Sequence, residues 1–211
     1  PIFAPYLGPA FLVSVGYMDP GNWATDIAGG ARFGYSLLWV LLMANLMALL
    51  LQYLSAKLGL ATGLTYPQVC RARFRGPLSF FLWLTAEAVA LATDLAEFLG
   101  AALGFYLLLH IPMFPAALIT ALAVLGILAL YRFGFRAVEF VVLGLVGIIG
   151  FAYVFEVMLV RPDWLNVAEG AFVPRLSDAS LLIAMGMLGA TVMPHNLYLH
   201  SGVVLSRRQT D

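Results

Sequence analysis

Long apolar segments follow one another along the chain, separated by short polar stretches. About 20 apolar residues suffice for a helix to cross the roughly 30 Å hydrocarbon core of a bilayer. We expect six spans, at about residues 6–31, 37–58, 78–109, 116–131, 137–160 and 179–205. The polar, partly basic segment 59–77 is expected to lie at the membrane interface, and 161–178 to be an amphiphilic loop.

Proline interrupts two of the expected spans. Asp19–Asn22 (DPGN) lies in the first span and Met193–Asn196 (MPHN) in the sixth, and the two stretches match at the proline and the asparagine. Proline lacks an N–H and clashes with the preceding helical turn, so both helices should unwind there. Unwound backbone at membrane depth is tolerated only where protein buries it or a cavity wets it. Paired breaks therefore indicate a substrate site near the bilayer midplane, as in transporters built from repeats.

Composition fits a polytopic membrane protein. Of the 211 residues, 63% are hydrophobic and 10% are charged, whereas a soluble domain carries about 25% charged residues. The formal net charge is zero and lysines and arginines form no nucleic-acid footprint, so we expect no nucleic-acid partner. The single cysteine, Cys70, cannot form a disulfide framework.

Basic residues predict the orientation, because lysine and arginine near span ends are retained on the cytoplasmic side. If the chain starts in the cytoplasm, eight of the eleven lie on inner loops: Lys57, Arg71, Arg73, Arg75, Arg132, Arg136, Arg207 and Arg208. The outer loops then hold Arg32, Arg161 and Arg175. We expect a multi-pass protein of the cell (inner) membrane with both ends in the cytoplasm.

The two breaks also predict the architecture, an all-helical membrane protein with a five-plus-five inverted repeat. The sixth helix of such a repeat must start on the opposite face from the first, and five crossings achieve this. Residues 1–160 would form the first repeat, 161–178 an extracellular loop, and 179–211 the first helix of the second repeat. The remaining helices of a longer transporter would then lie beyond Asp211.

The breaks supply several types of metal ligand. They offer a carboxylate, an amide, a thioether and freed backbone carbonyls, on Asp19, Asn22, Met193, Ala190 and Gly16. Oxygen ligands alone suit Mg²⁺ and Ca²⁺, whereas sulfur favours softer ions such as Mn²⁺, Fe²⁺, Co²⁺ or Cd²⁺. The simpler interpretation is that Met193 packs and Asp19 caps the half-helix that follows it. An ionisable residue at membrane depth is a functional candidate by default.

Three acids share one side of the third span. Glu87, Asp94 and Glu97 stand at offsets of seven and ten residues. Such groups are costly to bury unless they are partnered, protonated in turn or wet. They predict a proton path or, alternatively, an ion-pair network with cations on other helices. His195, whose residue type has an ordinary pKa of about 6.5, could relay or sense protons or hydrogen-bond across the broken helix.

The two motifs together resemble those of the Nramp family (natural resistance-associated macrophage proteins), which are proton-coupled divalent metal transporters of the amino-acid/sodium symporter fold. The resemblance covers the whole chain in span number, order and orientation, and is strongest to the family's bacterial manganese transporters. It implies that the metal binds the side chains of Asp19, Asn22 and Met193, with the carbonyls of Ala190 and Gly16. It implies that the proton is carried by Asp19, Asp94 and Glu97, supported by His195 and Glu87.

We therefore expect proton-coupled import of Mn²⁺ or Fe²⁺ by alternating access, with Cd²⁺ and Co²⁺ as further substrates and with no permanently bound cofactor. The expected partners are the metal ion, protons, the lipid bilayer and the remaining helices. No catalytic residue is expected. One alternative is a sodium-coupled symporter for a small organic solute, which has no need of a thioether. Others are a passive cation channel and an intramembrane metalloenzyme, although His195 and His200 lack the His-Glu-x-x-His pattern.

Overall fold

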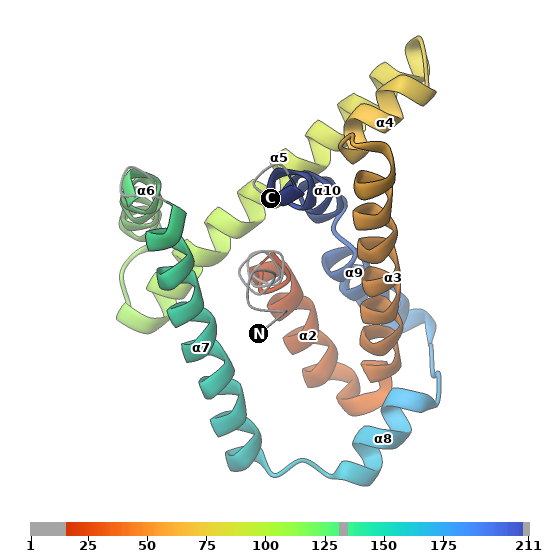
Figure 1. Cartoon of the computed structure of the whole chain (residues 1–211). Coiled ribbons are helices and arrows are strands. Elements are labelled where there is room, and N and C mark those ends of the chain that lie inside the picture. The colour runs from red at the N-terminus through yellow and green to blue at the C-terminus, as the bar shows by residue number, and fades with distance from the viewer. Residues whose placement is uncertain (1–15, 131–134, 209–211) are drawn as a thin grey trace, which may run out of the picture. The chain divides into compact units, whose positions relative to one another are not determined.

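The computed structural model describes residues 16–130 and 135–208, which form helices and no strand (Figure 1). The helices are α2 (Pro20–Phe33), the short 3-10 helix η1 (Gly34–Leu37), α3 (Leu38–Thr62), α4 (Tyr66–Arg73), α5 (Pro77–Leu109), α6 (Met113–Leu130), α7 (Phe135–Val160), α8 (Trp164–Phe172), α9 (Asp178–Thr191) and α10 (Pro194–Arg208).

Four stretches of the described chain are long and apolar enough to cross a membrane: Pro20–Thr62, Pro77–Leu109, Val141–Val160 and Asp178–Leu205. The first holds α2, η1 and α3. Its 43 residues are about twice the length of one span. Met113–Ala129 is a shorter apolar helix. The chain is therefore a multi-pass membrane protein. The part of the first expected span before Gly16 and the expected loop residue Arg132 lie outside the described residues.

Two segments that we expected to be interfacial or loop regions contain short helices. α4 begins at a capping box, in which the Gln68 side chain accepts a hydrogen bond from the Thr65 N–H at 2.9 Å. α8 lies within the expected 161–178 loop and packs tightly against the turn that precedes α3. A Cβ on Gly170 would lie 2.1 Å from the carbonyl oxygen of Tyr35, so this approach requires glycine.

The chain divides into two compact units. Unit 1 comprises Pro1–Gly21 and Asp94–Trp164, and unit 2 comprises Asn22–Thr93 and Leu165–Asp211. In unit 2, α9 and α10 both pack along α3, and α4 contacts α3 and α10 (Figure 1). In unit 1, α6 contacts α7.

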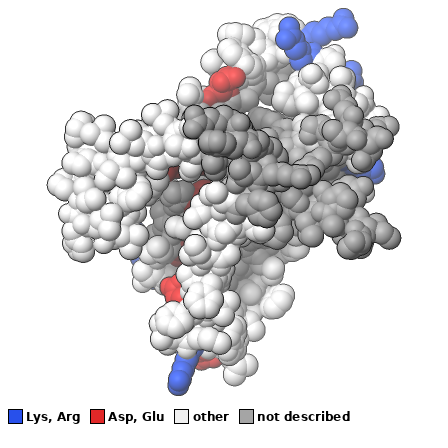
Figure 2. All heavy atoms as spheres, turned by 60° about the vertical axis from the view of Figure 1, so that its left-hand side comes forward, with Lys and Arg blue, Asp and Glu red and all other residues white. Residues whose placement is uncertain are grey.

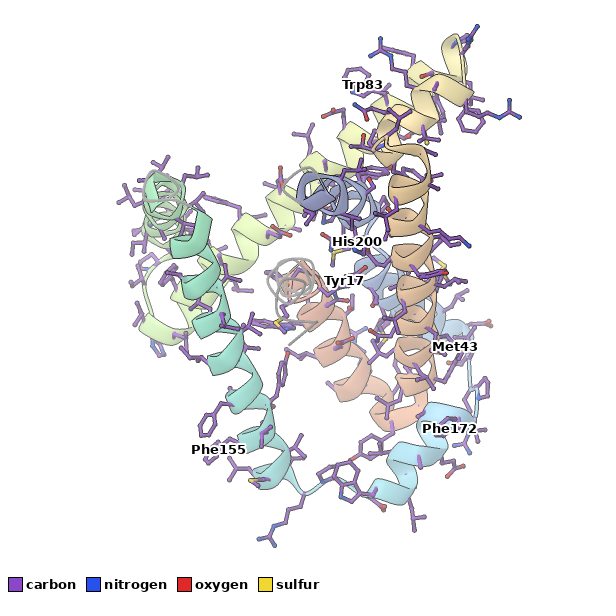
Figure 3. The ribbon with its side chains drawn as sticks, viewed as in Figure 1. Tyr17, Met43, Trp83, Phe155, Phe172 and His200 are labelled. Carbon is purple, nitrogen blue, oxygen red and sulfur yellow. The ribbon has the colours of Figure 1, made fainter. Side chains whose placement is uncertain are left out.

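Small and polar side chains form the contact face of α3. They recur every three or four residues and are buried: Ala44, Ala48, Gln52, Ser55 and Gly59. Small residues let membrane helices approach closely, and polar ones hydrogen-bond across the interface. The Ser55 hydroxyl donates to the Leu197 carbonyl at 2.6 Å. Nδ1 of His200 lies 2.5 Å from Oε1 of Gln52, on the side of α10 next to α3 (Figure 3).

Large apolar side chains cover much of the described surface. Among the described residues visible in Figure 2, most are uncharged, with charged side chains only in small groups. On α5, α6 and α7, residues such as Leu108, Phe114 and Phe151 are at least 74% exposed. Such a surface suits contact with lipid or with further membrane helices.

Candidate metal site

The first predicted break is present in its described half. Residues 16–18 form turns, Asp19 is not helical, and α2 starts at Pro20, where a missing N–H costs nothing. The Asp19 side chain is only 8% exposed. Because Asp19 directly precedes α2, it stands at the positive end of the helix dipole, which stabilises a carboxylate. The helix expected before Gly16 lies outside the described residues.

The second break is observed in full. α9 ends at Thr191 and α10 begins at Pro194, and the intervening Val192 has φ −92° and ψ 84°. In an unbroken helix the residue at position 194 would donate to the carbonyl of Ala190. Proline has no N–H, so the Ala190 carbonyl is released from the helical ladder. The prediction of an unwound segment near Met193 is confirmed.

The released carbonyl of Ala190 accepts a hydrogen bond from a side chain of the other broken helix. Nδ2 of Asn22 donates to the Ala190 carbonyl oxygen at 3.2 Å. The Asn22 amide oxygen accepts from the Thr191 hydroxyl at 3.1 Å, and that hydroxyl also lies 2.8 Å from the Met187 carbonyl. These contacts orient the Asn22 amide and join the first turn of α2 to the end of α9.

Met193 is held in a polar setting. Its side chain is 5% exposed, and its sulfur accepts a hydrogen bond from Nδ2 of Asn196 at 3.5 Å. The apolar cluster of the described chain lies elsewhere, around Leu37, Val40 and Met187. The ligand role of the thioether stays a prediction, with packing as the alternative.

Of the five predicted metal ligands, Asn22 and Ala190 are joined by a hydrogen bond within unit 2. Met193 lies three residues after Ala190 in the same unit. Asp19 stands three residues before Asn22, on the other side of the same helix start. Gly16 lies in the turn that precedes Asp19. Within the described ranges, no group of three His, Cys, Asp or Glu side chains could hold a metal. The predicted ligand set differs from such a group, because it combines the Asp19 carboxylate with amide, carbonyl and thioether ligands.

The predicted proton-path acids fall into two groups. In unit 1, the carboxylate of Glu97 interacts electrostatically with those of Asp19 and Asp94. Glu87 is two turns earlier on α5, in unit 2, and lines a cavity that neither Asp94 nor Glu97 lines. His195 lies in the first turn of α10, half-buried. Asp19 is therefore the residue shared by the acid cluster and the first helix break.

A close approach between α5 and the first break leads to a prediction. A Cβ added at Gly100 would lie 2.1 Å from Cβ of Pro20, and the proline ring cannot bend away. Gly100→Ala should therefore displace Pro20, at a cost of about 1–3 kcal/mol of overpacking, and weaken Mn²⁺ binding in calorimetry. The control is Gly104→Ala on the next turn of α5, where a Cβ meets nothing within 4 Å. Equal effects of the two variants would refute the prediction.

Sequence reasoning missed Thr191 and Asn196. The alignment of DPGN with MPHN pairs Asn196 with Asn22, and both side chains are buried and hydrogen-bonded. That repeated asparagine was the available signal. Nothing in the sequence marked Thr191, because its role depends on a contact with a residue 169 positions away.

The Thr191 hydroxyl gives a second prediction. Thr191→Val keeps the side-chain shape but removes the donor that orients Asn22, so we expect Mn²⁺ affinity to fall about tenfold, as for other supporting partners of metal ligands. Thr120→Val is the matched control, because this buried hydroxyl only donates back to Ala116 within α6. Titration calorimetry of both variants decides the matter. If the two bind Mn²⁺ equally well, Thr191 has no positioning role.

Comparison with known proteins identifies the family of the chain. The model of the natural resistance-associated macrophage protein-like family, Nramp, matches residues 10–211. Divalent metal cation transporters named MntH are similar, with 53% identity over 208 residues in Deinococcus radiodurans and 50% over 204 residues in Bacillus subtilis. These matches cover 98% and 96% of this chain and 48% of each relative. The chain thus spans about half the length of the curated relatives that it matches.

A solved structure of a manganese transporter is also similar to this chain. The manganese transporter of Eremococcus coleocola, crystallised with an aromatic bis-isothiourea compound, superposes with a TM-score of 0.80 at 44% identity, over 96% of this chain and 43% of that one. The predicted amino-acid/sodium symporter-like fold is confirmed. The relatives are named as transporters rather than enzymes, as we expected. With a family model covering nearly all of its residues, the chain belongs to the Nramp family.

Proposed function

We propose that this chain takes part in proton-coupled import of divalent transition metals, with Mn²⁺ or Fe²⁺ as physiological substrates and Cd²⁺ and Co²⁺ also accepted. The metal binds Asp19, Asn22 and Met193 through side chains and Ala190 through its carbonyl, with Gly16 contributing a carbonyl in some states. It is cargo rather than a resident cofactor. The relatives' names, as manganese and divalent metal transporters, support this substrate class.

One observation carries the proposal: the hydrogen bond from Asn22 to the Ala190 carbonyl. It places an amide from one broken helix against the freed carbonyl of the other, three residues before Met193, whose thioether is buried. A sulfur ligand discriminates against Mg²⁺ and Ca²⁺, which are far more abundant in cells than the transition metals. Rocking of the broken helices against the rest of the fold then alternates access to the metal.

The proposed proton coupling depends on acidic side chains at the first helix break and on α5. We assign the coupled proton to Asp19, Asp94 and Glu97, with His195 and Glu87 in support. The electrostatic interaction of Glu97 with Asp19 and Asp94 supports this assignment. A divalent cation at Asp19 adds positive charge beside the other two carboxyl groups, which favours release of their protons. Metal binding and proton release are thereby linked.

The orientation is part of the proposal. With both ends of the chain in the cytoplasm, eight of eleven lysines and arginines face inward. This arrangement places the loop containing α8 outside the cell and α4 inside, in the cell (inner) membrane.

Uptake of Mn²⁺ into liposomes tests the proposal. We expect an inward proton gradient to accelerate uptake, and a pH-sensitive dye inside the vesicles to report acidification that requires Mn²⁺. A rate of Mn²⁺ uptake that does not depend on the proton gradient would instead support a passive channel. Uptake of an organic solute that depends on Na⁺ and is unaffected by Mn²⁺ would support the symporter alternative.

A further inference from the structure

A cavity of about 940 Å³ lies in unit 2 beside α4. Its walls come from α4, the linker that follows, the first turns of α5, and Tyr198 of α10. None of the proposed metal ligands lines it. Its volume is at the upper end of the roughly 300–1,000 Å³ of small-molecule sites. The cavity is therefore large enough for a ligand distinct from the transported metal.

The cavity lies at a membrane surface. One membrane-spanning stretch ends at Thr62 and the next begins at Pro77, so residues 63–76 connect two spans. This connection carries three positive charges and no aspartate or glutamate. The positive charges are those of Arg71, Arg73 and Arg75.

α4 is fixed in place at this surface. The backbone N–H of Tyr66 donates to the hydroxyl of Ser201 on α10 at 2.9 Å. The rings of Tyr66 and Tyr198 stack with centroids 5.5 Å apart and form one wall of the cavity. Burial, and then the neighbouring Cys70, raises the pKa of the Tyr66 phenol, which stays a neutral hydrogen-bond donor. The cavity wall is thus preformed.

Two arginines give the cavity its charge. Arg71 and Arg75 line it, whereas Arg73 does not. Neither lining arginine makes an ion pair in the described part of the chain, where Arg175 pairs with Glu169. Arginine is suited to phosphate because its planar fork can donate two parallel hydrogen bonds.

The lining also includes one acid, farther along α5. Glu87 is eleven residues beyond Gly76 on α5, about 16 Å along the axis at 1.5 Å per residue. An anion near Arg75 can therefore avoid the Glu87 carboxylate.

The rest of the lining is apolar and aromatic. Phe74, Phe80 and Trp83 are 40%, 62% and 55% exposed, and the Phe80 and Trp83 rings lie 5.7 Å apart. Figure 3 shows Trp83 on the end of α5 next to α4. Aromatic residues near the end of a membrane-spanning stretch are typical of the membrane–water interface. A free phosphate ion would leave these rings without a partner, whereas an acyl chain would cover them.

We infer that this cavity binds one anionic phospholipid, with its phosphate on Arg71 and Arg75 and its acyl chains against Phe80 and Trp83. Basic pockets at the ends of membrane helices recognise such headgroups. The binding does not require metal transport, so it can be tested separately from the proposed function.

Native mass spectrometry of the full chain in detergent, titrated with phosphatidylglycerol, tests the inference. We expect one tight adduct. Arg71→Gln and Arg75→Gln should each weaken it about fivefold, as expected for loss of one cation near an anionic headgroup. Arg73→Gln is the matched control, since it removes an equal charge from the same segment outside the cavity, and it should leave the adduct unchanged.

Competing ligands identify the source of the phosphate. Phosphatidylcholine with the same acyl chains and inorganic phosphate should both compete poorly. An equal loss of the adduct in all three variants would overturn the inference by indicating nonspecific attraction. Effective competition by inorganic phosphate would overturn it in favour of a soluble anion. Absence of the adduct in the unmodified protein, with the chain forming dimers, would indicate that a second copy covers the cavity.

Discussion

Replacing Asp19 by asparagine is expected to weaken Mn²⁺ binding at least about 100-fold and to abolish uptake. The change keeps the side-chain size but removes the one carboxylate from the proposed ligand set. Removing one partner of a buried charge pair costs about 3–5 kcal/mol, and each 1.4 kcal/mol is tenfold in affinity. Titration calorimetry with Mn²⁺ measures the loss. Proton movement should cease as well, because Asp19 also belongs to the acid cluster with Asp94 and Glu97.

A matched control separates the site from the overall charge of the protein. Asp178→Asn makes the same chemical change at an exposed position in the first turn of α9. It should leave Mn²⁺ affinity within about twofold, because surface substitutions seldom change free energies by more than about 0.5 kcal/mol. If Asp19→Asn bound Mn²⁺ as well as Asp178→Asn, the carboxylate would be a helix cap and not a ligand.

Met193→Ala is expected to change selectivity. Without the thioether, the site keeps only oxygen ligands, so Mn²⁺ and Cd²⁺ should bind at least about tenfold more weakly while Ca²⁺ or Mg²⁺ gains entry. Competition of Ca²⁺ against Mn²⁺ in liposome uptake measures this change directly.

Met187→Ala distinguishes this effect from loss of packing. Met187 is also buried, at 3% exposure, but packs in the apolar cluster with Leu37 and Val40. Its truncation should lower stability by about 2–5 kcal/mol, as for other buried methionines, without altering metal preference. Unchanged selectivity in Met193→Ala, together with a similar loss of stability, would show that Met193 only packs.

Much of the fold could be predicted from the sequence because hydrophobic length dictates membrane helices. The expected ends of the third span, at about 78 and 109, agree closely with α5. α4 and α8 were missed as helices, since they are short and not continuously apolar. The interface between α3 and α10 was also missed, because Ser55 and Gly59 read as ordinary small residues until their partners on α10 are placed.

The candidate site could be predicted from the sequence where the missing N–H of proline determines the backbone. Pro194 by itself releases the carbonyl of Ala190, and the structure shows that release. The partner of the carbonyl could not be deduced, because Asn22 is 168 residues away. Helical spacing put Glu87, Asp94 and Glu97 on one side of α5. It could not reveal that Glu87 lines the cavity beside α4, whereas Asp94 and Glu97 do not line it.

The most direct measurement is the anomalous scattering of Mn²⁺ in crystals of the metal-soaked protein. We expect one strong peak in direct coordination with the Asp19 carboxylate and the Met193 sulfur, and its loss in the Asp19→Asn variant. A peak that contacts neither side chain, or one that persists unchanged in that variant, would contradict this expectation.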